Sequence, residues 1–367
     1  MAPLTTRSLL LGAFSLLTLL NSPCHAADDT SALKRKLLWI STGLGELNTG
    51  PNGGLNGMPS SRIESITRKP WGRAPETCVG TAIEADKNNG GKKRCEEEDL
   101  QIWGVKYADC GIEAVMCVCK TAQVSIHEVA YEFGKVPVRA RQWVRHIAVM
   151  PDTSCHAWAW MGGEENNIVI LGPCHNSTSL YLHEVGHCLD AAGGRMKGSY
   201  SQTAGYQNVV NGDGCISDRY AHNSWADNFA QVAVMATYHR NVRSIWTHEI
   251  DAGCMQGAIN NVVGLLGTAI QHGGVCEGGL PVDNDVCVGK KARAQGLCEG
   301  IPDKAKNHLS SEFDKRETHQ LGPKLTEEER KNLEEINRQI KHDDLEHIYE
   351  TGPGKRSIRD EFIRFVA

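Results

Sequence analysis

After the apolar stretch near its N-terminus, the chain lacks any apolar run long enough to span a membrane, so we expect no transmembrane helix. It also lacks a large excess of one charge. The net charge is −5 in 367 residues, which gives no reason to expect nucleic acid or a membrane surface as a partner. It contains no Cys-x-x-Cys pair, which argues against a structural zinc finger, and no internal repeat. Its length suits one large globular domain or two ordinary ones.

The N-terminus has the features of a secretory signal peptide. Arg7 precedes the apolar run Leu9–Leu20, and Cys24-His25-Ala26 offers a cleavage site before Ala27. We therefore expect residues 1–26 to be removed and the protein to be secreted into the extracellular medium.

Secretion determines how the cysteines are interpreted. Thirteen of the 14 cysteines remain after removal of Cys24, and in an oxidising compartment most of them should form disulfides. The sequence leaves their connectivity open, but an odd number leaves at least one unpaired. Cys188 is the candidate, because it lies within an expected helix.

Apolar spacing predicts a short series of helices and strands. A helical pattern covers 124–133, and three short apolar strands are expected at 147–150, 157–160 and 168–171. Asn176-Ser177-Thr178 should open a helix that runs to about Ala192 and ends at Gly193-Gly194, and a second helix should span 224–238. This order of elements predicts an α+β fold.

Composition divides the mature chain into three parts. Residues 27–104 form a Cys/Gly-rich N-terminal region, 105–300 the main domain, and 301–367 a strongly charged tail without cysteine. Thr326 and Glu329 form a capping-box pattern before an amphipathic stripe in this tail. That helix is either solvated and loosely docked, or a partner-binding segment.

The stretch His183-Glu184-Val185-Gly186-His187 has the HExxH pattern of zinc sites. Residues four apart on a helix share one face, so the two imidazoles can bind one ion. Glu184 can act as general base on a water molecule that zinc activates. We therefore expect one catalytic Zn²⁺ held by His183 and His187. The alternative is that the motif is a chance match within a purely structural helix.

A catalytic zinc needs a third protein ligand. In one zinc-peptidase class this ligand is a His further along the chain, with a Gly at the turn before it. Here Gly193 occupies the place of that His and Asp190 the place of that Gly. The ligand should therefore come from a later segment, within which the candidates are Asp218, His222, Asp227 and His239. Asp227 is favoured because it starts the second helix and can point across at the first. Gln231, one turn further on, could accept the outer N–H of a ligating His, and Asp190 is a further candidate for supporting the ligands.

These residues carry a resemblance. The HExxH stretch with Asp190, followed by Tyr220-Ala221-His222 and Ala226-Asp227-Asn228-Phe229-Ala230-Gln231, resembles the catalytic domain of anthrax lethal factor and related zinc metallopeptidases. The resemblance implies a zincin-like domain with a small mixed sheet. It also implies that Asp227 is the third zinc ligand and that Tyr220 assists the transition state. The family ligand is normally Glu where this chain has Asp227, and an acidic residue stands in the family where this chain has Gln231; both departures imply lowered activity.

A wider likeness extends upstream. The chain resembles secreted fungal conidiation-specific proteins, which carry a similar HExxH region, at Asp109-Cys110, Val115-Met116-Cys117-Val118-Cys119, Val136-Pro137-Val138 and Val144-Arg145. This likeness implies a fungal origin and secretion, and no established substrate.

The sequence therefore predicts a secreted, monomeric zinc metalloendopeptidase that acts on proteins or peptides. The alternative is a secreted zinc-binding interaction protein, an effector or spore-associated protein with little peptidase activity. A disulfide-stapled structural protein without metal is a third interpretation. Asn176 begins the chain's N-glycosylation sequon, and a glycan there would partly shade the cleft.

Overall fold

The structure, a computed structural model, describes residues 29–80, 94–160, 166–192, 199–280, 282 and 284–301. The expected signal peptide, the Gly193-Gly194 helix end and the tail helix lie outside the described residues. Helices and strands are mixed along the chain, which confirms the α+β prediction. No helix in the described part is long and apolar enough to cross a bilayer.

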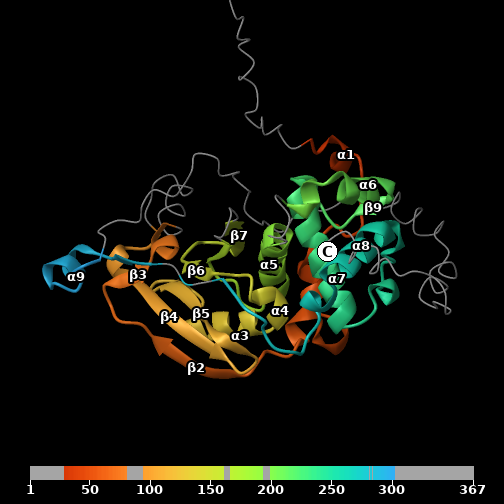
Figure 1. Ribbon diagram of the computed structural model, residues 1–367. Coiled ribbons are helices and arrows are strands. Elements are labelled where there is room, and N and C mark those ends of the chain that lie inside the picture. Colours follow the sequence, from red (N-terminus) through yellow and green to blue (C-terminus); the bar gives the residue numbers. More distant parts are fainter. Residues whose placement is uncertain are drawn as a thin grey trace, which may run out of the picture.

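A six-stranded mixed sheet forms one half of the molecule (Figure 1). β2, β4 and β5 are antiparallel neighbours, β5, β6 and β8 run parallel, and β7 returns antiparallel along β8 at the edge. In spatial order the strands are β2 (Ile63–Arg68), β4 (Leu100–Tyr107), β5 (Cys110–Cys119), β6 (His146–Met150), β8 (Asn167–Leu171) and β7 (His156–Trp160).

The three short strands expected from apolar runs are confirmed as β6, β7 and β8. Every residue of β6 and β8 is buried, as expected for central parallel strands covered on both faces. β2, β4 and β5 were not predicted from the sequence. In β4, buried residues alternate with partly exposed ones over its first half, so this strand has no continuous apolar run. In β5 only residues 114–119 are continuously apolar, and the first half of the strand is partly or fully exposed. The expected domain boundary at residue 105 falls inside β4, and the sheet takes strands from both sides of it.

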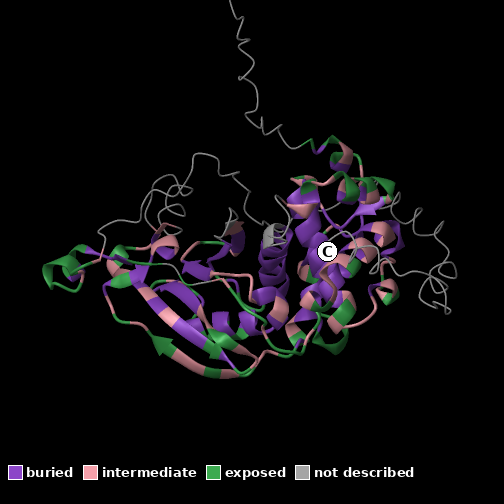
Figure 2. Ribbon diagram, viewed as in Figure 1, coloured by how far each residue is buried: buried purple, intermediate pink, exposed green. Residues whose placement is uncertain are grey.

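Helices form the other half of the molecule (Figure 1). The expected helices are confirmed as α3, α5 and α7, the last extending to Asn241. The helices are α1 (Ser31–Lys34), α3 (Ile126–Gly134), α4 (Val138–Arg141), α5 (Thr178–Ala192), α6 (Ala204–Gly212), α7 (Trp225–Asn241), α8 (Gln256–Leu266) and α9 (Lys290–Ala294). Figure 2 shows that α5 and much of α7 are buried between the sheet and the other helices.

Two apolar clusters stabilise this arrangement. The larger joins one face of the sheet to the helices, and the smaller packs on the other face beneath residues near 74–79 and 286–288. Leu33, Trp39 and Leu44 belong to the larger cluster, so the N-terminal segment is part of the main core. Two small sheets complete the fold: β1 (Leu37–Leu38) with β9 (Cys215–Ile216), and β3 (Arg73–Pro75) with β10 (Asp285–Cys287).

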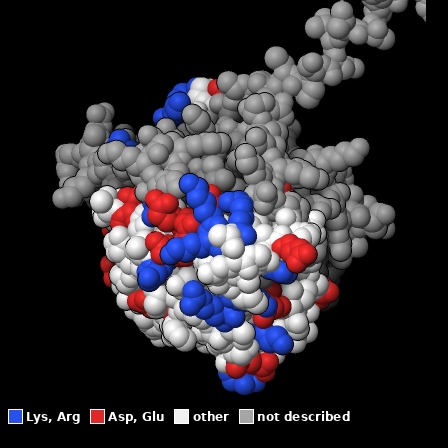
Figure 3. Space-filling model, turned by 90° about the vertical axis from the view of Figure 1, so that its left-hand side faces the viewer, with Lys and Arg blue, Asp and Glu red and all other residues white. Residues whose placement is uncertain are grey.

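Six disulfides link distant parts of the chain, and Cys188 is the free cysteine of the described residues, as expected. The pairs are Cys78–Cys117, Cys95–Cys119, Cys110–Cys276, Cys155–Cys174, Cys215–Cys254 and Cys287–Cys298. Basic and acidic side chains are interspersed over the face at the sheet end of the molecule (Figure 3). The small net charge is thus not separated into a single-sign surface on this face.

Candidate metal centre

α5 is anchored at its start by side chains from the N-terminal segment. The backbone N–H groups of Thr178 and Ser179 donate to Asn56 Oδ1 and Asn48 Oδ1, at 3.3 and 2.8 Å. These groups have no partner within the helix, so the two asparagines satisfy donors that would otherwise be buried and unpaired. The first turn of α5 is therefore held by residues more than a hundred positions earlier in the chain.

Ser224 caps α7 and fixes the side chain of Asp227. Its hydroxyl accepts from the Asp227 backbone N–H at 2.9 Å and donates to Asp227 Oδ2 at 2.6 Å. One carboxylate oxygen is thus occupied by the cap. The other, Oδ1, is buried and accepts no hydrogen bond from the described part of the chain.

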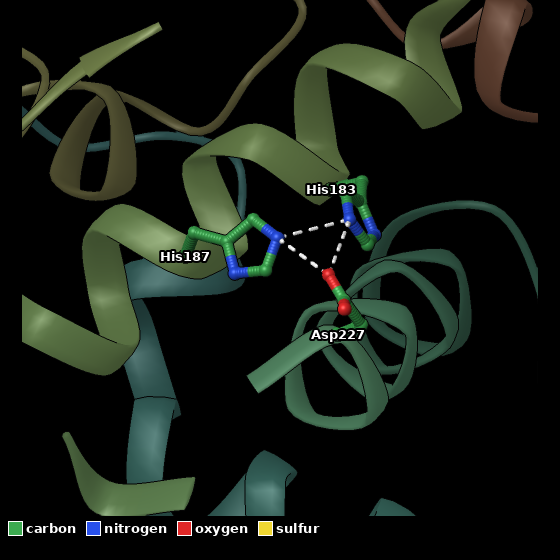
Figure 4. A group of neighbouring side chains, drawn as sticks. All are labelled: His183, His187 and Asp227. Carbon is green, nitrogen blue, oxygen red and sulfur yellow. Dashed lines mark hydrogen bonds and ion pairs between the residues drawn. The ribbon is translucent and has the colours of Figure 1, made fainter. Parts of the chain in front are cut away.

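Oδ1 of Asp227 points at the two histidines of α5 (Figure 4). It lies 3.2 Å from Nε2 of His187 and 3.9 Å from Nε2 of His183, and the two Nε2 atoms are 3.0 Å apart. All three residues are at most 2% exposed. The structure thus brings together the three residues that the sequence analysis expected to bind the ion.

This geometry suits a small cation with tetrahedral coordination. At zinc–ligand distances of about 2.0–2.1 Å, tetrahedral ligand atoms lie about 3.4 Å from one another, close to the three separations here. The donor set of two imidazoles and one carboxylate is one that zinc uses in catalytic sites. A buried carboxylate oxygen without a hydrogen-bond donor also calls for a positive partner. The group of His183, His187 and Asp227 could hold a metal ion.

Gln231 lies behind the first histidine, as the sequence analysis expected. Its Oε1 is 3.0 Å from Nδ1 of His183, one turn along α7 from Asp227. Its amide nitrogen donates to Asp218 Oδ2 at 2.7 Å. Asp218, considered as an alternative ligand, therefore contacts Gln231 and belongs to the surroundings of the site.

The other two alternative ligands have contacts elsewhere. Nε2 of His222 is 3.4 Å from the backbone oxygen of Lys36. The His239 ring packs against Trp246, and its Nδ1 accepts from the Ile245 N–H at 3.1 Å. Neither belongs to the group of described residues that could hold a metal ion.

Tyr220 is near the centre. It lies in a short 3₁₀ helix, Tyr220–His222, just before α7, and its ring meets that of His183 edge-on with centroids 5.2 Å apart. The structure therefore brings Tyr220 next to an expected ligand. This position agrees with a role close to the ion, and the role of its hydroxyl stays a prediction.

Glu184 is buried, with 1% of its surface exposed. It lies one turn before Cys188, and burial together with the nearby Glu184 carboxylate raises the pKa of the Cys188 thiol well above its ordinary value. Cys188, which lies within the same helix, is therefore an unreactive neutral thiol.

Asp190 and Asn176 lie at opposite ends of α5. Asp190 accepts from the backbone N–H and the hydroxyl of Ser201, at 2.7 and 2.6 Å, which ties the end of α5 to the segment before α6. Asn176 is exposed and adopts a φ of +48°, while Thr178 of its sequon is buried. The support of a ligand by Asp190 and the glycan at Asn176 stay predictions.

Comparison with known proteins identifies the family. The family model of the conidiation-specific protein Con-13 matches residues 42–343. The chain belongs to the Con-13 family. It is 34% identical over 252 residues to conidiation-specific protein 13 of Neurospora crassa, an alignment that covers 68% of this chain and 70% of the relative. No solved structure matches.

The Con-13 match spans the whole candidate centre, from the N-terminal segment that anchors α5 to both helices that carry the candidate ligands. The likeness to conidiation-specific proteins expected from the sequence is thereby confirmed. The family name says nothing of a reaction, so the chemistry must be inferred from the site.

Proposed function

We propose that this Con-13 protein is a secreted, zinc-dependent metallopeptidase. The observation that carries the proposal is the convergence of His183 Nε2, His187 Nε2 and Asp227 Oδ1 within 4.8 Å of one another on two packed helices. Six disulfides support secretion, because such bonds persist in oxidising compartments. The likeness in sequence of residues 183–190 and 220–231 to the catalytic domain of anthrax lethal factor is the reason for proposing a peptidase of zincin-like fold.

A zinc ion at this site supplies a Lewis acid that polarises a substrate carbonyl and lowers the pKa of water. In the proposed reaction, Glu184 takes a proton from the attacking water and passes it to the leaving amine. The hydroxyl of Tyr220 donates to the oxygen that becomes negative in the transition state. Asp227 and the two histidines would hold the ion, and a zinc ion with three protein ligands would still be able to bind water or substrate.

Proteins or peptides are the proposed substrates, and the proposed form is a monomer. β7 is one of the two edge strands of the sheet, is antiparallel to β8 and contacts α5. An edge strand offers backbone donors and acceptors to an extended peptide. A peptide chain is therefore a suitable ligand for this side of the molecule.

A second function is favoured by one observation. His183, Glu184, His187 and Asp227 are all at most 2% exposed, so the candidate centre is closed to solvent. A closed site with zinc would stabilise the packing of α5 on α7 without turnover. The second function is therefore that of a secreted zinc-binding interaction protein, associated with spores or with a host.

The two functions are separated by metal analysis and a cleavage assay on one set of variants. Purified protein should contain one zinc per chain, and Asp227→Ala should lose it. Casein or a peptide library should be cleaved, and Glu184→Gln or a chelator should abolish cleavage.

Glu128→Gln, which changes an exposed carboxylate in α3, is the matched control and should retain zinc and activity. Zinc without cleavage would establish the interaction protein. Protein that binds no zinc would refute both metal-dependent functions. Equal cleavage by Glu184→Gln would show that the activity comes from another site.

A further inference from the structure

Asp218 is a buried carboxylate that serves only as an acceptor in its described hydrogen bonds. Oδ2 accepts from the Leu44 backbone N–H at 3.1 Å and from Gln231 Nε2 at 2.7 Å, and Oδ1 accepts from the Ala221 N–H at 3.2 Å. The residue is 2% exposed. The backbone N–H groups of Leu44 and Ala221 therefore fix the Asp218 carboxylate, whose Oδ2 accepts from the side chain of Gln231.

This acceptor determines the orientation of the Gln231 amide. Oxygen and nitrogen of an amide exchange places when the group turns by half a rotation, so the partners decide which one points where. If the amide were reversed, its oxygen would lie against Oδ2 of Asp218, with no hydrogen between the two atoms. The NH₂ group must face Asp218, and Oε1 must face His183.

The orientation of Gln231 in turn selects the tautomer of His183. Oε1 can only accept, so Nδ1 of His183, 3.0 Å away, must carry the ring proton. A neutral imidazole then has its lone pair on Nε2. Nε2 is the atom that faces Asp227 Oδ1 and His187 Nε2. A reversed amide would place the proton on Nε2 and remove it as a ligand.

We propose that Asp218 is a positioning residue for the metal centre: through Gln231 it fixes His183 as the Nδ1–H tautomer, with Nε2 ready to bind the ion. The tautomer of His183 is a property of the metal-free protein and does not depend on the proposed zinc site. Only the use of this tautomer, which is to bind the ion, rests on that proposed function. It also gives the N-terminal segment a role, because the Leu44 N–H helps to hold Asp218.

Gly43 is suited to this contact. Its φ of +90° is a conformation that glycine adopts without strain, and a Cβ atom there would lie 3.6 Å from Asp218 Oδ2. The turn thus delivers the Leu44 N–H to a carboxylate more than 170 residues later in the chain. The hydrogen-bonded series runs from Leu44 through Asp218 and Gln231 to His183.

The test uses two readouts on the full mature protein labelled with ¹⁵N-histidine. The ring-nitrogen shifts of metal-free protein report the tautomer of His183, assigned with His183→Gln. Competition with a chromogenic chelator reports zinc affinity. The variants are Asp218→Ala, the double variant Asp218→Ala/Gln231→Glu, and Asp109→Ala, which removes a carboxylate that pairs with Arg141 away from the site.

Wild type should show a single Nδ1–H tautomer. Asp218→Ala should populate the Nε2–H tautomer and weaken zinc binding by about tenfold, the lower end of the range for such supporting partners. Glu at position 231 accepts in every orientation, so the double variant should restore the tautomer and bring zinc affinity to within a few-fold of wild type. Asp109→Ala should change neither readout.

Wild-type tautomer and zinc affinity in Asp218→Ala would overturn the proposal. So would a loss that Gln231→Glu does not restore, because a merely structural role would give that result. If Asp218→Ala does not fold, Asp218→Asn takes its place, and its added donor should again permit the second tautomer. A wild type with the single tautomer but no zinc binding would refute the metal centre and leave the role of Asp218 intact.

Discussion

Gly186 of α5 and Ala230 of α7 touch without space for another side chain between them. A Cβ atom on Gly186 would lie 3.0 Å from Cα of Ala230, 3.2 Å from its backbone oxygen and 3.3 Å from its Cβ. Gly186 lies within the HExxH stretch, and Ala230 lies in the turn that follows Asp227. The close approach of the two helices at this point allows Asp227 to reach both histidines.

Substitution of Gly186 by Ala should therefore destabilise the protein and weaken zinc binding. Overpacking of a tight contact costs about 1–3 kcal/mol, more than Ala contributes through its higher helix propensity. Gly264→Ala is the matched control, because Gly264 in α8 is exposed and has no atom within 4 Å of an added Cβ. That control should gain up to about 1 kcal/mol. Denaturant unfolding with zinc titration measures both, and equal stabilisation by the two changes would disprove the packing argument.

Ser224→Ala should affect both stability and metal binding. Loss of the cap should cost about 1 kcal/mol, and without the hydroxyl the Asp227 carboxylate is free to turn, which should weaken zinc binding by about tenfold. Thr203→Ala removes a similar cap from α6, where the hydroxyl accepts from the Tyr206 N–H. It should cost comparable stability and leave zinc affinity unchanged. The same loss of affinity in both variants would mean that the cap of α7 has no special role.

Asp213 should make stability depend on pH. Burial raises the pKa of this carboxyl from 3.8 to about 6, although the N–H groups of Ala258 and Gly257 and the charge of Lys36 act in the opposite direction. Between pH 4 and 6 the folded protein then binds more protons than the unfolded chain, so this group's contribution falls as pH rises, by up to about 3 kcal/mol. The difference in unfolding free energy between wild type and Asp213→Asn should change over this range. A difference that stays constant from pH 4 to 7 would contradict the raised pKa.

Cys188 should be unreactive in the folded protein. Its pKa is raised by burial and by Glu184, so a thiol reagent such as Ellman's should detect no thiol in native protein that begins at residue 27. In denaturant without reductant it should detect one, since the other twelve cysteines form six disulfides. Two or more thiols would show that one of these disulfides is absent.

Local sequence patterns predicted a helix or strand correctly where the pattern lay entirely within that one element. The caps and apolar spacing around α5 and α7 predicted both helices, and the short apolar runs predicted β6, β7 and β8. β4 and β5 were missed because their side chains face different surroundings along each strand.

The sequence by itself determined that His183 and His187 share one helix face, because a spacing of four residues is a property of the helix alone. It also identified Cys188 as unpaired and favoured Asp227 over three other candidates. Only the tertiary structure decided that Asp227 reaches the histidines, that Gly186 permits this approach, and that Asp218 contacts Gln231. These contacts join residues between 13 and 44 positions apart. Packing of separate elements, which no local spacing encodes, brings them together.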